Sequence, residues 1–298
     1  MTAPSGPSFK DHLTTNLLRV LPQHLLAAGM YRLMRSEIPW LKDQLISRLS
    51  QRYDIDVSEA ANPDPLSYPS FNAFFTRALR DDARPIASDG IVSPADGRVS
   101  QIGSISGETL IQAKGHDFSL TALLAGDKDK VQTFRDGLWT TIYLSPRDYH
   151  RVHLPYAGTL TSMIFVPGEL FSVSEATAQL VPNLFARNER VICYFDTALG
   201  PMAVILVGAI FVGSMETVWH GEVRAGRGYP TRWDYAGKDA PTFSTGDEIG
   251  RFNMGSTVIV LLPPGAAAWQ GDINAGSAVR MGQAIGQPME VGGDASAQ

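Results

Sequence analysis

The strongest constraint on the fold is a change of pattern near residue 90, after which short β-prone runs follow one another between turn sequences. Asp-Gly pairs such as Asp136-Gly137 separate several of these runs and are typical of tight turns. The runs that we expect as strands are 91–92, 98–102, 109–112, 138–144, 158–166, 190–197, 202–212, 214–219 and 257–263. Many short strands joined by turns favour antiparallel pairing. Residues 90–285 are therefore predicted to form a mainly antiparallel β core.

The segment over residues 10–53 has a different pattern, because its apolar residues recur at helical spacing. Pro22 and Pro39 divide the segment, and both positions suit the first turn of a helix. The apolar stripes are Leu13, Leu17 and Leu21, then Leu26, Met30, Leu33 and Met34, and finally Leu41, Leu45, Ile46 and Leu49. These two or three amphipathic helices and the β core predict an α+β fold. We expect a helical region over 1–69 and a β-rich domain over 70–298.

Two shorter helices are also predicted. Ser70 is a suitable N-cap residue for the first of them. The side chains expected to share one face of that helix are those of Phe71, Phe74, Phe75 and Leu79. The run 119–124 is followed by Gly126, which is typical of a short helix that ends at a glycine.

Charge is unevenly distributed along the chain. Residues 10–52 hold seven Lys or Arg and three Asp or Glu, a net charge of +4, whereas the whole chain carries −5. This asymmetry predicts that the N-terminal segment meets an anionic partner. Its apolar stripes could pack on the protein's own core or lie in a membrane interface, and both can hold for different helices. The sequence contains no basic run with interleaved aromatic residues, so nothing in it predicts binding to nucleic acid.

Other features indicate the setting in which the chain folds. Cys193 is the only cysteine, so an intramolecular disulfide and a Cys-rich metal site are excluded. The longest charge-free apolar stretch, Met202–Met215, has fourteen residues and is too short to cross a bilayer. The first residues lack the pattern of a secretory signal. A reducing, cytoplasmic setting fits these observations.

The pair Gly255-Ser256 is the first candidate for chemistry, because it comes directly before the apolar run 258–262. Glycine at a strand entry permits unusual backbone geometry and leaves its carbonyl open to attack. A serine placed just after that carbonyl could attack it and convert the peptide bond into an ester. The alternative is an ordinary strand start.

Two histidines, His150 and His153, lie three residues apart in the segment DYHRVHLP. On a helix they could share a metal ion. Strand-like runs flank the segment and Pro155 follows it, so we interpret it as extended. Side chains three apart on a strand point to opposite faces, which favours two separate roles, although either imidazole could be a structural hydrogen-bonding group.

Asp96 lies in the segment SPADGRVS, where Asp-Gly is a common turn pair. Its carboxylate could instead orient a histidine, as the third member of a Ser-His-Asp set does. Asp96, His153 and Ser256 offer all three roles, although their order in the sequence does not establish that they are close in space.

These three segments, in this order, resemble those of the bacterial-type phosphatidylserine decarboxylases. Three further segments do so as well, namely FNAFFTR over 71–77, QAKGH over 112–116 and GSMETVW over 213–219. The similarity extends from about residue 10 to 290, and the ordered set is far more specific than any one piece. Members commonly have Leu-Gly-Ser-Thr where this chain has Met254. Because Met and Leu have similar volumes, we expect cleavage to survive.

The resemblance implies that Asp96, His153 and Ser256 form a self-cleavage triad. His153 would take the proton of Ser256, and Asp96 would hold the imidazole ring in orientation. The Ser256 oxygen would attack the Gly255 carbonyl, and elimination from the resulting ester would separate fragments 1–255 and 256–298. The smaller fragment would begin with a pyruvoyl group made from Ser256.

The resemblance also implies the second reaction. The pyruvoyl ketone would form a Schiff base with phosphatidylserine and accept the electrons left by carbon dioxide, yielding phosphatidylethanolamine. His150 would be the acid/base group that returns a proton to the α-carbon. The pyruvoyl group would be the only cofactor, with no metal. Lys114, His116 and several arginines could meet the phosphate. The resemblance further implies a homodimer at the cytoplasmic face of the cell membrane, which residues 1–69 would contact.

Three alternatives stay open at this point. A Ser-His-Asp hydrolase would keep Ser256 intact, although the G-x-S-x-G sequence of α/β-hydrolases is absent around it. A β-rich lipid-binding module would not depend on Ser256 or His150. Another pyruvoyl decarboxylase, acting on a soluble amino acid, would not need the basic amphipathic start.

Overall fold

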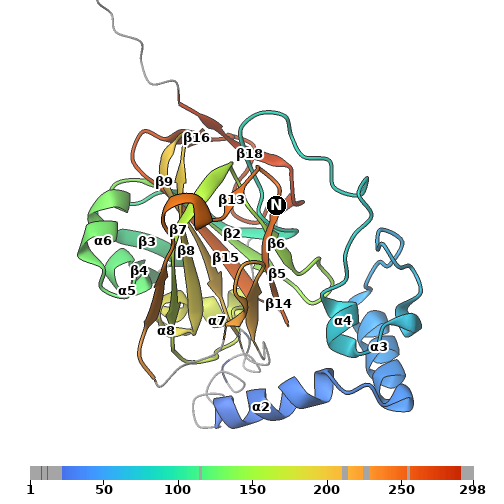
Figure 1. Ribbon diagram of the computed structural model, residues 1–298. Coiled ribbons are helices and arrows are strands. Elements are labelled where there is room, and N and C mark those ends of the chain that lie inside the picture. Colours follow the sequence, from blue (N-terminus) through green and yellow to red (C-terminus); the bar gives the residue numbers. More distant parts are fainter. Residues whose placement is uncertain are drawn as a thin grey trace, which may run out of the picture.

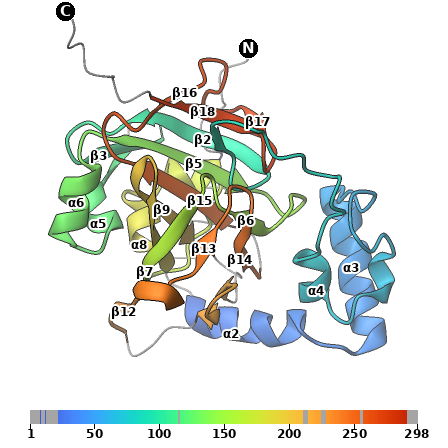
Figure 2. The same ribbon diagram turned by 45° about the horizontal axis from the view of Figure 1, so that its top comes forward.

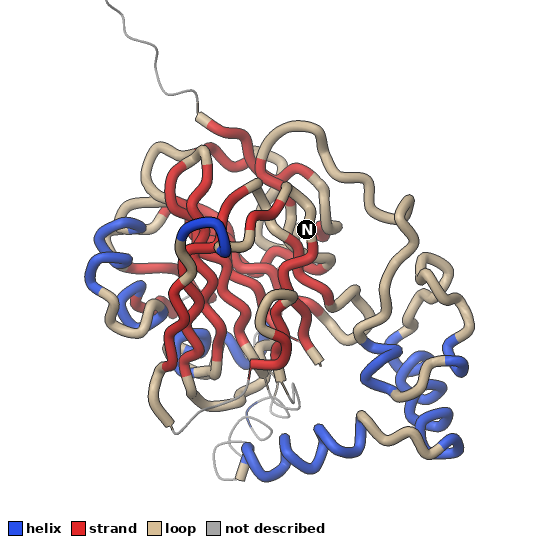
Figure 3. Tube along the Cα trace, in the orientation of Figure 1, coloured by secondary structure: helices blue, strands red, loops and turns tan. Residues whose placement is uncertain are grey.

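The structure is a computed structural model that describes Ser8, His12 and residues 22–113, 116–209, 214–223, 228–253 and 256–289. Its strands form a central β body, and its helices lie around the edge of that body (Figure 1, Figure 3). Within the described residues the named strands pair only in antiparallel fashion. The predicted α+β class with a mainly antiparallel core is confirmed.

Four of the described α-helices begin at a residue whose side chain caps them. The side chains of Ser70, Ser119, Asp127 and Ser174 each accept a hydrogen bond from a backbone N–H of the following turn. The α-helices are α2 (Gln23–Met34), α3 (Pro39–Tyr53), α4 (Phe71–Phe75), α5 (Leu120–Leu123), α6 (Lys128–Phe134), α7 (Glu175–Ala178) and α8 (Leu184–Arg187). Two 3-10 helices are η1 (Pro65–Ser67) and η2 (Gly237–Asp239). In both ribbon views α5 and α6 lie on the opposite side of the β body from α3 and α4 (Figure 2).

Helix α4 is shorter than predicted, because it ends at Phe75 and leaves Leu79 outside. Leu79 pairs with Ala60 in an isolated antiparallel bridge, so the backbone after the helix bonds to the preceding loop instead of continuing the helix. The predicted helices after Pro22 and Pro39 are confirmed as α2 and α3. The first apolar stripe, over residues 13–21, lies outside the described residues.

The main sheet of the described residues has nine strands in the order β12-β7-β8-β9-β15-β5-β2-β17, with β13 also pairing with β7. Its strands are β2 (Gly97–Ser104), β5 (Leu138–Leu144), β7 (Gly158–Val166), β8 (Arg190–Thr197), β9 (Gly200–Val207), β12 (Thr231–Asp234), β13 (Thr242–Phe243), β15 (Ser256–Leu262) and β17 (Ala278–Val279). The predicted strands over 138–144, 158–166 and 190–197 are confirmed with the same bounds. Every residue of β15 is buried, and β9 and β5 flank it.

Three smaller sheets complete the β body. One has the order β11-β10-β14-β6, another β1-β18-β16, and a hairpin joins β3 and β4. Their strands are β1 (Ile91–Val92), β3 (Thr109–Ala113), β4 (His116–Ser119), β6 (Arg151–His153), β10 (Met215–Thr217), β11 (Gly221–Val223), β14 (Glu248–Phe252), β16 (Ala267–Trp269) and β18 (Ala284–Pro288). The strand predicted over 202–212 ends at Val207, and residues 210–213 lie outside the described residues. The run after them joins the β14 sheet instead of the main one.

A second, smaller core lies among the N-terminal helices. It is formed by Met34, Ile46, Ile55, Phe71, Phe74 and Phe75. Other apolar side chains of α2 and α3 are exposed to solvent, including Leu25 at 71% and Trp40 at 69% exposure. The apolar residues of this segment are therefore divided between core packing and an exposed surface. Among the described residues, no helix combines the length and apolar character needed to cross a bilayer.

Candidate active site

Ser256 is the first residue of β15 and pairs with Leu144 at the end of β5. Its side chain is completely buried, and its Oγ has no hydrogen-bond partner among the described residues. Leaving a buried hydroxyl unpaired costs about 1–3 kcal/mol, so such groups call for an explanation. The Ser256 oxygen is thus held on a central strand, and no described residue forms a hydrogen bond with it. Gly255, its predicted target, lies outside the described residues.

His150 lies at the same end of β5. Its Nε2 is 3.1 Å from the carbonyl oxygen of Ser145, the residue after Leu144, and a carbonyl can only accept, so Nε2 carries the proton. The imidazole ring stacks on Phe75 of α4 with a centroid distance of 4.0 Å. Burial, and secondly the charge of Arg77, lower the pKa of His150 to about 3. The ring is therefore neutral, and its Nδ1 has no partner among the described residues.

His153 lies in β6 and has different neighbours. Its Nδ1 donates to the carbonyl oxygen of Gly246 at 2.8 Å, so its Nε2 holds the lone pair. The hydroxyl of Tyr149 lies 3.1 Å from that Nε2 and donates to it. Burial lowers the pKa of His153, which keeps the imidazole in the form that can accept a proton. The two histidines of the segment thus have separate partners.

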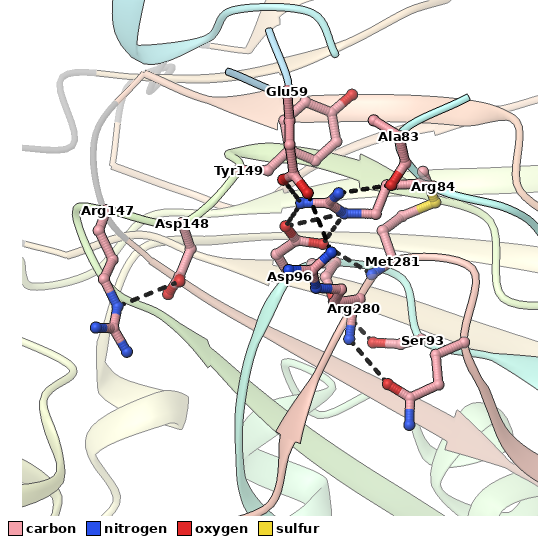
Figure 4. Close-up of polar contacts among 12 residues, drawn as sticks. Glu59, Ala83, Arg84, Ser93, Asp96, Arg147, Asp148, Tyr149, Arg280 and Met281 are labelled. Atoms are coloured by element: carbon pink, nitrogen blue, oxygen red, sulfur yellow. Dashed lines mark hydrogen bonds and ion pairs between the residues drawn. The ribbon is translucent and has the colours of Figure 1, made fainter. Parts of the chain in front are cut away.

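Asp96, just before β2, is engaged by an arginine instead of a histidine. Arg84 donates to both oxygens of its carboxylate, with distances of 2.9 Å from Nε and 2.5 Å from Nη2. The backbone N–H of Met281 donates to the same carboxylate at 2.8 Å. Glu59 accepts from Arg84 on its other side, so the guanidinium lies between two carboxylates (Figure 4).

The expected triad is therefore not joined by direct hydrogen bonds in the described part of the uncleaved chain. Gly246, not Asp96, accepts from the Nδ1 of His153 and orients its ring. Asp96 and Tyr149 line a cavity of about 430 Å³, together with Arg77 and Tyr143. Ser256 pairs with Leu144, the neighbour of Tyr143 in β5. Because side chains alternate along a strand, that of Ser256 points to the face turned away from Tyr143.

Two residues of this region were missed by the sequence reasoning. Tyr149 is buried and bonded to His153, and it stands inside the DYHRVH segment. Arg77 is only 4% exposed, and its Nε and Nη1 have no hydrogen-bond partner among the described residues. Its Nη2 makes one long contact of 3.4 Å to the carbonyl of Arg147. The sequence did not single out these two residues, because only the fold places them beside the histidines.

Comparison with known proteins gives a consistent result. A family model described as phosphatidylserine decarboxylase matches residues 71–287, and a second one, described as PSD, matches residues 13–54. The phosphatidylserine decarboxylase proenzyme of Methylococcus capsulatus is 54% identical over 277 residues, which are 92% of this chain and 96% of that protein. That of Marinobacter nauticus is 53% identical over 271 residues, 90% and 95% of the two chains. That of Bordetella avium is 51% identical over 283 residues, 94% and 96% of the two chains.

The burial of His150 predicts a pH dependence of stability. Its folded pKa, about 3, lies below the usual value of 6.5, so the unfolded chain binds a proton first as the pH falls. The contribution of neutral His150 to the unfolding free energy is complete above pH ~6.5 and is lost toward pH ~3. The experiment uses the uncleavable Ser256→Ala protein as the parent. The unfolding free energy of this parent should fall between pH 7 and pH 5, and in His150→Gln the fall should be smaller by about 2 kcal/mol. Denaturant titrations at both pH values measure the difference.

The exposed His24 provides the matched control for this experiment, since His24→Gln replaces the same side chain outside the core. It should leave the pH dependence of the parent unchanged. An identical pH dependence in the His150→Gln and parent proteins would show that His150 is not held neutral by the fold.

Proposed function

The chain belongs to the phosphatidylserine decarboxylase family, and we propose that it converts phosphatidylserine to phosphatidylethanolamine through a pyruvoyl group that it makes from its own Ser256. The observation that carries the proposal is the buried Ser256 Oγ at the head of the central strand, which has no hydrogen-bond partner within the part of the chain that the structure describes. The hydrolase alternative finds no support, because the relatives at 51–54% identity are all named decarboxylase proenzymes. The products of processing are the fragments 1–255 and 256–298.

Self-cleavage needs a base for the serine proton, and His153 is the proposed one. Its Nε2 holds a lone pair, which accepts a hydrogen bond from the Tyr149 hydroxyl. In the proposed reaction the Ser256 hydroxyl replaces Tyr149 as the donor to this nitrogen. A C–O bond forms between the Ser256 Oγ and the Gly255 carbonyl carbon while the C–N bond breaks, and the proton taken by His153 passes to the Ser256 nitrogen. Removal of the Ser256 α-proton then expels the Gly255 carboxylate from Cβ and leaves dehydroalanine. This tautomerises to an imine, which water hydrolyses to the ketone with release of ammonia. We propose that Asp96, fixed by Arg84, stabilises positive charge on His153 across space.

The surroundings of Ser256 fit a pyruvoyl group. The site is buried and has no donor or acceptor bonded to the Ser256 oxygen among the described residues, so replacing the alcohol by a ketone breaks no hydrogen bond. Once formed, the group supplies an electron-accepting carbonyl that takes the electron pair left by carbon dioxide.

His150 is proposed as the proton carrier of the decarboxylation. Its Nδ1 has no hydrogen-bond partner in the described ranges, and a neutral imidazole can take the proton that the substrate ammonium must lose. The same nitrogen can return this proton to the α-carbon after carbon dioxide has left. Phe75, stacked on the ring, excludes water from one face of it. His150 thus starts the cycle as a base and ends it as an acid.

Arg77 is proposed as the contact for the phosphate of the lipid head group. It is a buried cation near His150 with unused donors and no ion-pair partner within 4 Å among the described residues. A buried charge normally requires a counter-ion, and arginine matches the oxygens of a phosphate. The phosphate is unchanged in the reaction, so binding it holds the substrate without resisting the loss of carbon dioxide.

The N-terminal region, residues 1–69, is proposed to bind the membrane. Leu25, Ile38 and Trp40 expose apolar surface on or beside α2 and α3. The basic segment 10–52 would be attracted to anionic lipids by about 1 kcal/mol for each Lys or Arg near the surface. The protein would then act as a peripheral enzyme, in our proposal a homodimer, on the cytoplasmic face of the cell membrane.

Intact-mass measurement tests the processing step. The purified protein should give two fragments, and the one that begins at residue 256 should resist Edman degradation because its first residue has no amine. Ser256→Ala should remain one uncut and inactive chain, because alanine has no oxygen nucleophile. A fully active enzyme that consists of one uncut chain would contradict the proposal.

Arg77 is tested by steady-state kinetics on the processed enzyme with soluble glycerophosphoserine. Arg77→Met keeps the packing on Phe74 but removes the charge, and should raise KM about 10- to 100-fold, as expected for losing hydrogen bonds to a charged group. Arg98→Met is the control, since Arg98 lines the same cavity but bonds to the Gly276 carbonyl. An unchanged KM in Arg77→Met would rule out this role.

Membrane binding is tested by sedimentation with vesicles that contain anionic lipid. Leu25→Ser combined with Trp40→Ser should lower the bound fraction at least about fivefold, because both side chains are exposed and apolar. Ile111→Ser is the control, since Ile111 is 51% exposed but lies in β3 on the β body. Equal binding by both variants would place the contact elsewhere.

A further inference from the structure

We propose that Asn253 is a positioning residue for self-cleavage, and that the N-terminal helix α2 supports it through Arg35 and Ser214. The inference rests on the proposed processing at Ser256 and adds the residues that fix the approach to the scissile bond. Asn253 follows β14 directly and precedes Gly255 by two positions.

The side chain of Asn253 is held from three sides. It is 1% exposed, and its Nδ2 donates to the Oγ of Ser214 at 2.6 Å and to Glu216 at 3.1 Å. Its Oδ1 accepts from Nδ2 of Asn72 in α4 at 3.1 Å. Its backbone N–H also donates to the carbonyl of Ser214 at 3.2 Å. Both the main chain and the side chain of this residue are therefore fixed.

The preceding residue is fixed as well. The backbone N–H of Phe252 donates to the carbonyl of His150 at 3.0 Å, and β14 pairs with β6 and β10 on its two sides. On the far side of the scissile bond, Ser256 is bound into the main sheet. Only residues 254 and 255 connect these two anchored ends, so the anchor at Asn253 limits where the Gly255 carbonyl can lie relative to Ser256.

Position matters because the attacking and attacked atoms must approach to about 3–3.5 Å with the correct alignment. An error of about 1 Å can reduce the rate of such a step about 100-fold. The amide of Asn253 is well suited to prevent this error, since it bonds at once to α4 and to residues 214–216.

Helix α2 reaches the same network. Arg35, the residue after α2, donates to Ser214 Oγ at 3.2 Å and lies 3.5 Å from a carboxylate oxygen of Glu222. Tyr31 of α2 donates to Glu222 at 3.0 Å. Ser214 Oγ thus receives hydrogen bonds from both Arg35 and Asn253. Arg35 also lies 3.9 Å from the Glu216 oxygen that accepts from Asn253, so a displacement of α2 would reach Asn253 through both Ser214 and Glu216.

The test measures the rate of self-cleavage of freshly synthesised full-length chain, made by cell-free translation with labelled methionine and followed on denaturing gels. Asn253→Ala should slow cleavage about 10- to 100-fold. Arg35→Ala, at a half-buried position, should slow it about three- to tenfold. Gln112→Ala is the matched control, because Gln112 is also fully buried and its amide makes three hydrogen bonds, to Ala178, Val181 and Leu184, none of which belongs to β14 or β15.

A second variant separates positioning from stability. Asn253→Asp keeps the shape but places a carboxylate against Glu216, and burial beside a like charge raises the pKa of such an acid. Its cleavage should be slow at pH 8 and at least about fivefold faster at pH 6, a dependence that the parent should lack. This readout does not depend on how stable the Ala variant is.

Two results would overturn the proposal. Parental cleavage rates in both Asn253 variants would do so, and so would an equal slowing in Gln112→Ala. A parental rate in Arg35→Ala would remove the link to α2. If the parental chain itself is not cleaved, the proposed function fails, which is a distinct outcome because no variant is needed to see it.

Discussion

Strand β15 is the constraint on which the structure depends. Its neighbours β9 and β5 take its backbone hydrogen bonds along almost its whole length, and all its residues from Ser256 to Leu262 are buried. A nucleophile at the head of such a strand cannot move with a loop to meet its target. The target carbonyl must instead be brought to it, which gives the residues before the scissile bond their importance. The proposed role of Asn253 follows because the Ser256 oxygen is fixed and the Gly255 carbonyl has to be positioned next to it.

Burial gives the polar groups around this strand their chemical character. Removing water from His150 and His153 lowers the pKa of both, so the imidazoles are neutral and hold lone pairs. Arg77 is also buried, but its charge is not balanced by an ion pair within the described residues. Asp96 and Arg84 balance one another. A neutral base beside an unbalanced cation is an environment suited to a substrate that carries both an ammonium group and negative charge.

The fold also explains how the two fragments can stay associated after the chain is cut. Strands β15, β17 and β18 follow the cleavage position and pair with β5, β2 and β1, which precede it. The N–H of Met281 bonds to Asp96 across the same division, and Arg280 lies 3.1 Å from Glu59. Breaking one peptide bond leaves these interactions in place. The carboxylate expected in self-cleavage is thus also part of what holds the two fragments together.

The sequence alone determined the α+β class and several strands with their bounds, and it indicated the candidate residues for the chemistry. Turn pairs, β-prone runs and helical spacing are local properties, and the ordered segments around Asp96, His153 and Ser256 indicated the family. Only the tertiary structure decided which groups bond to one another. Gly246 orients His153, Arg84 holds Asp96, and Asn253 meets Asn72 from a distant helix. These contacts join residues 12 to 181 positions apart, and no local pattern encodes such a pairing, because it depends on how the sheets and helices pack.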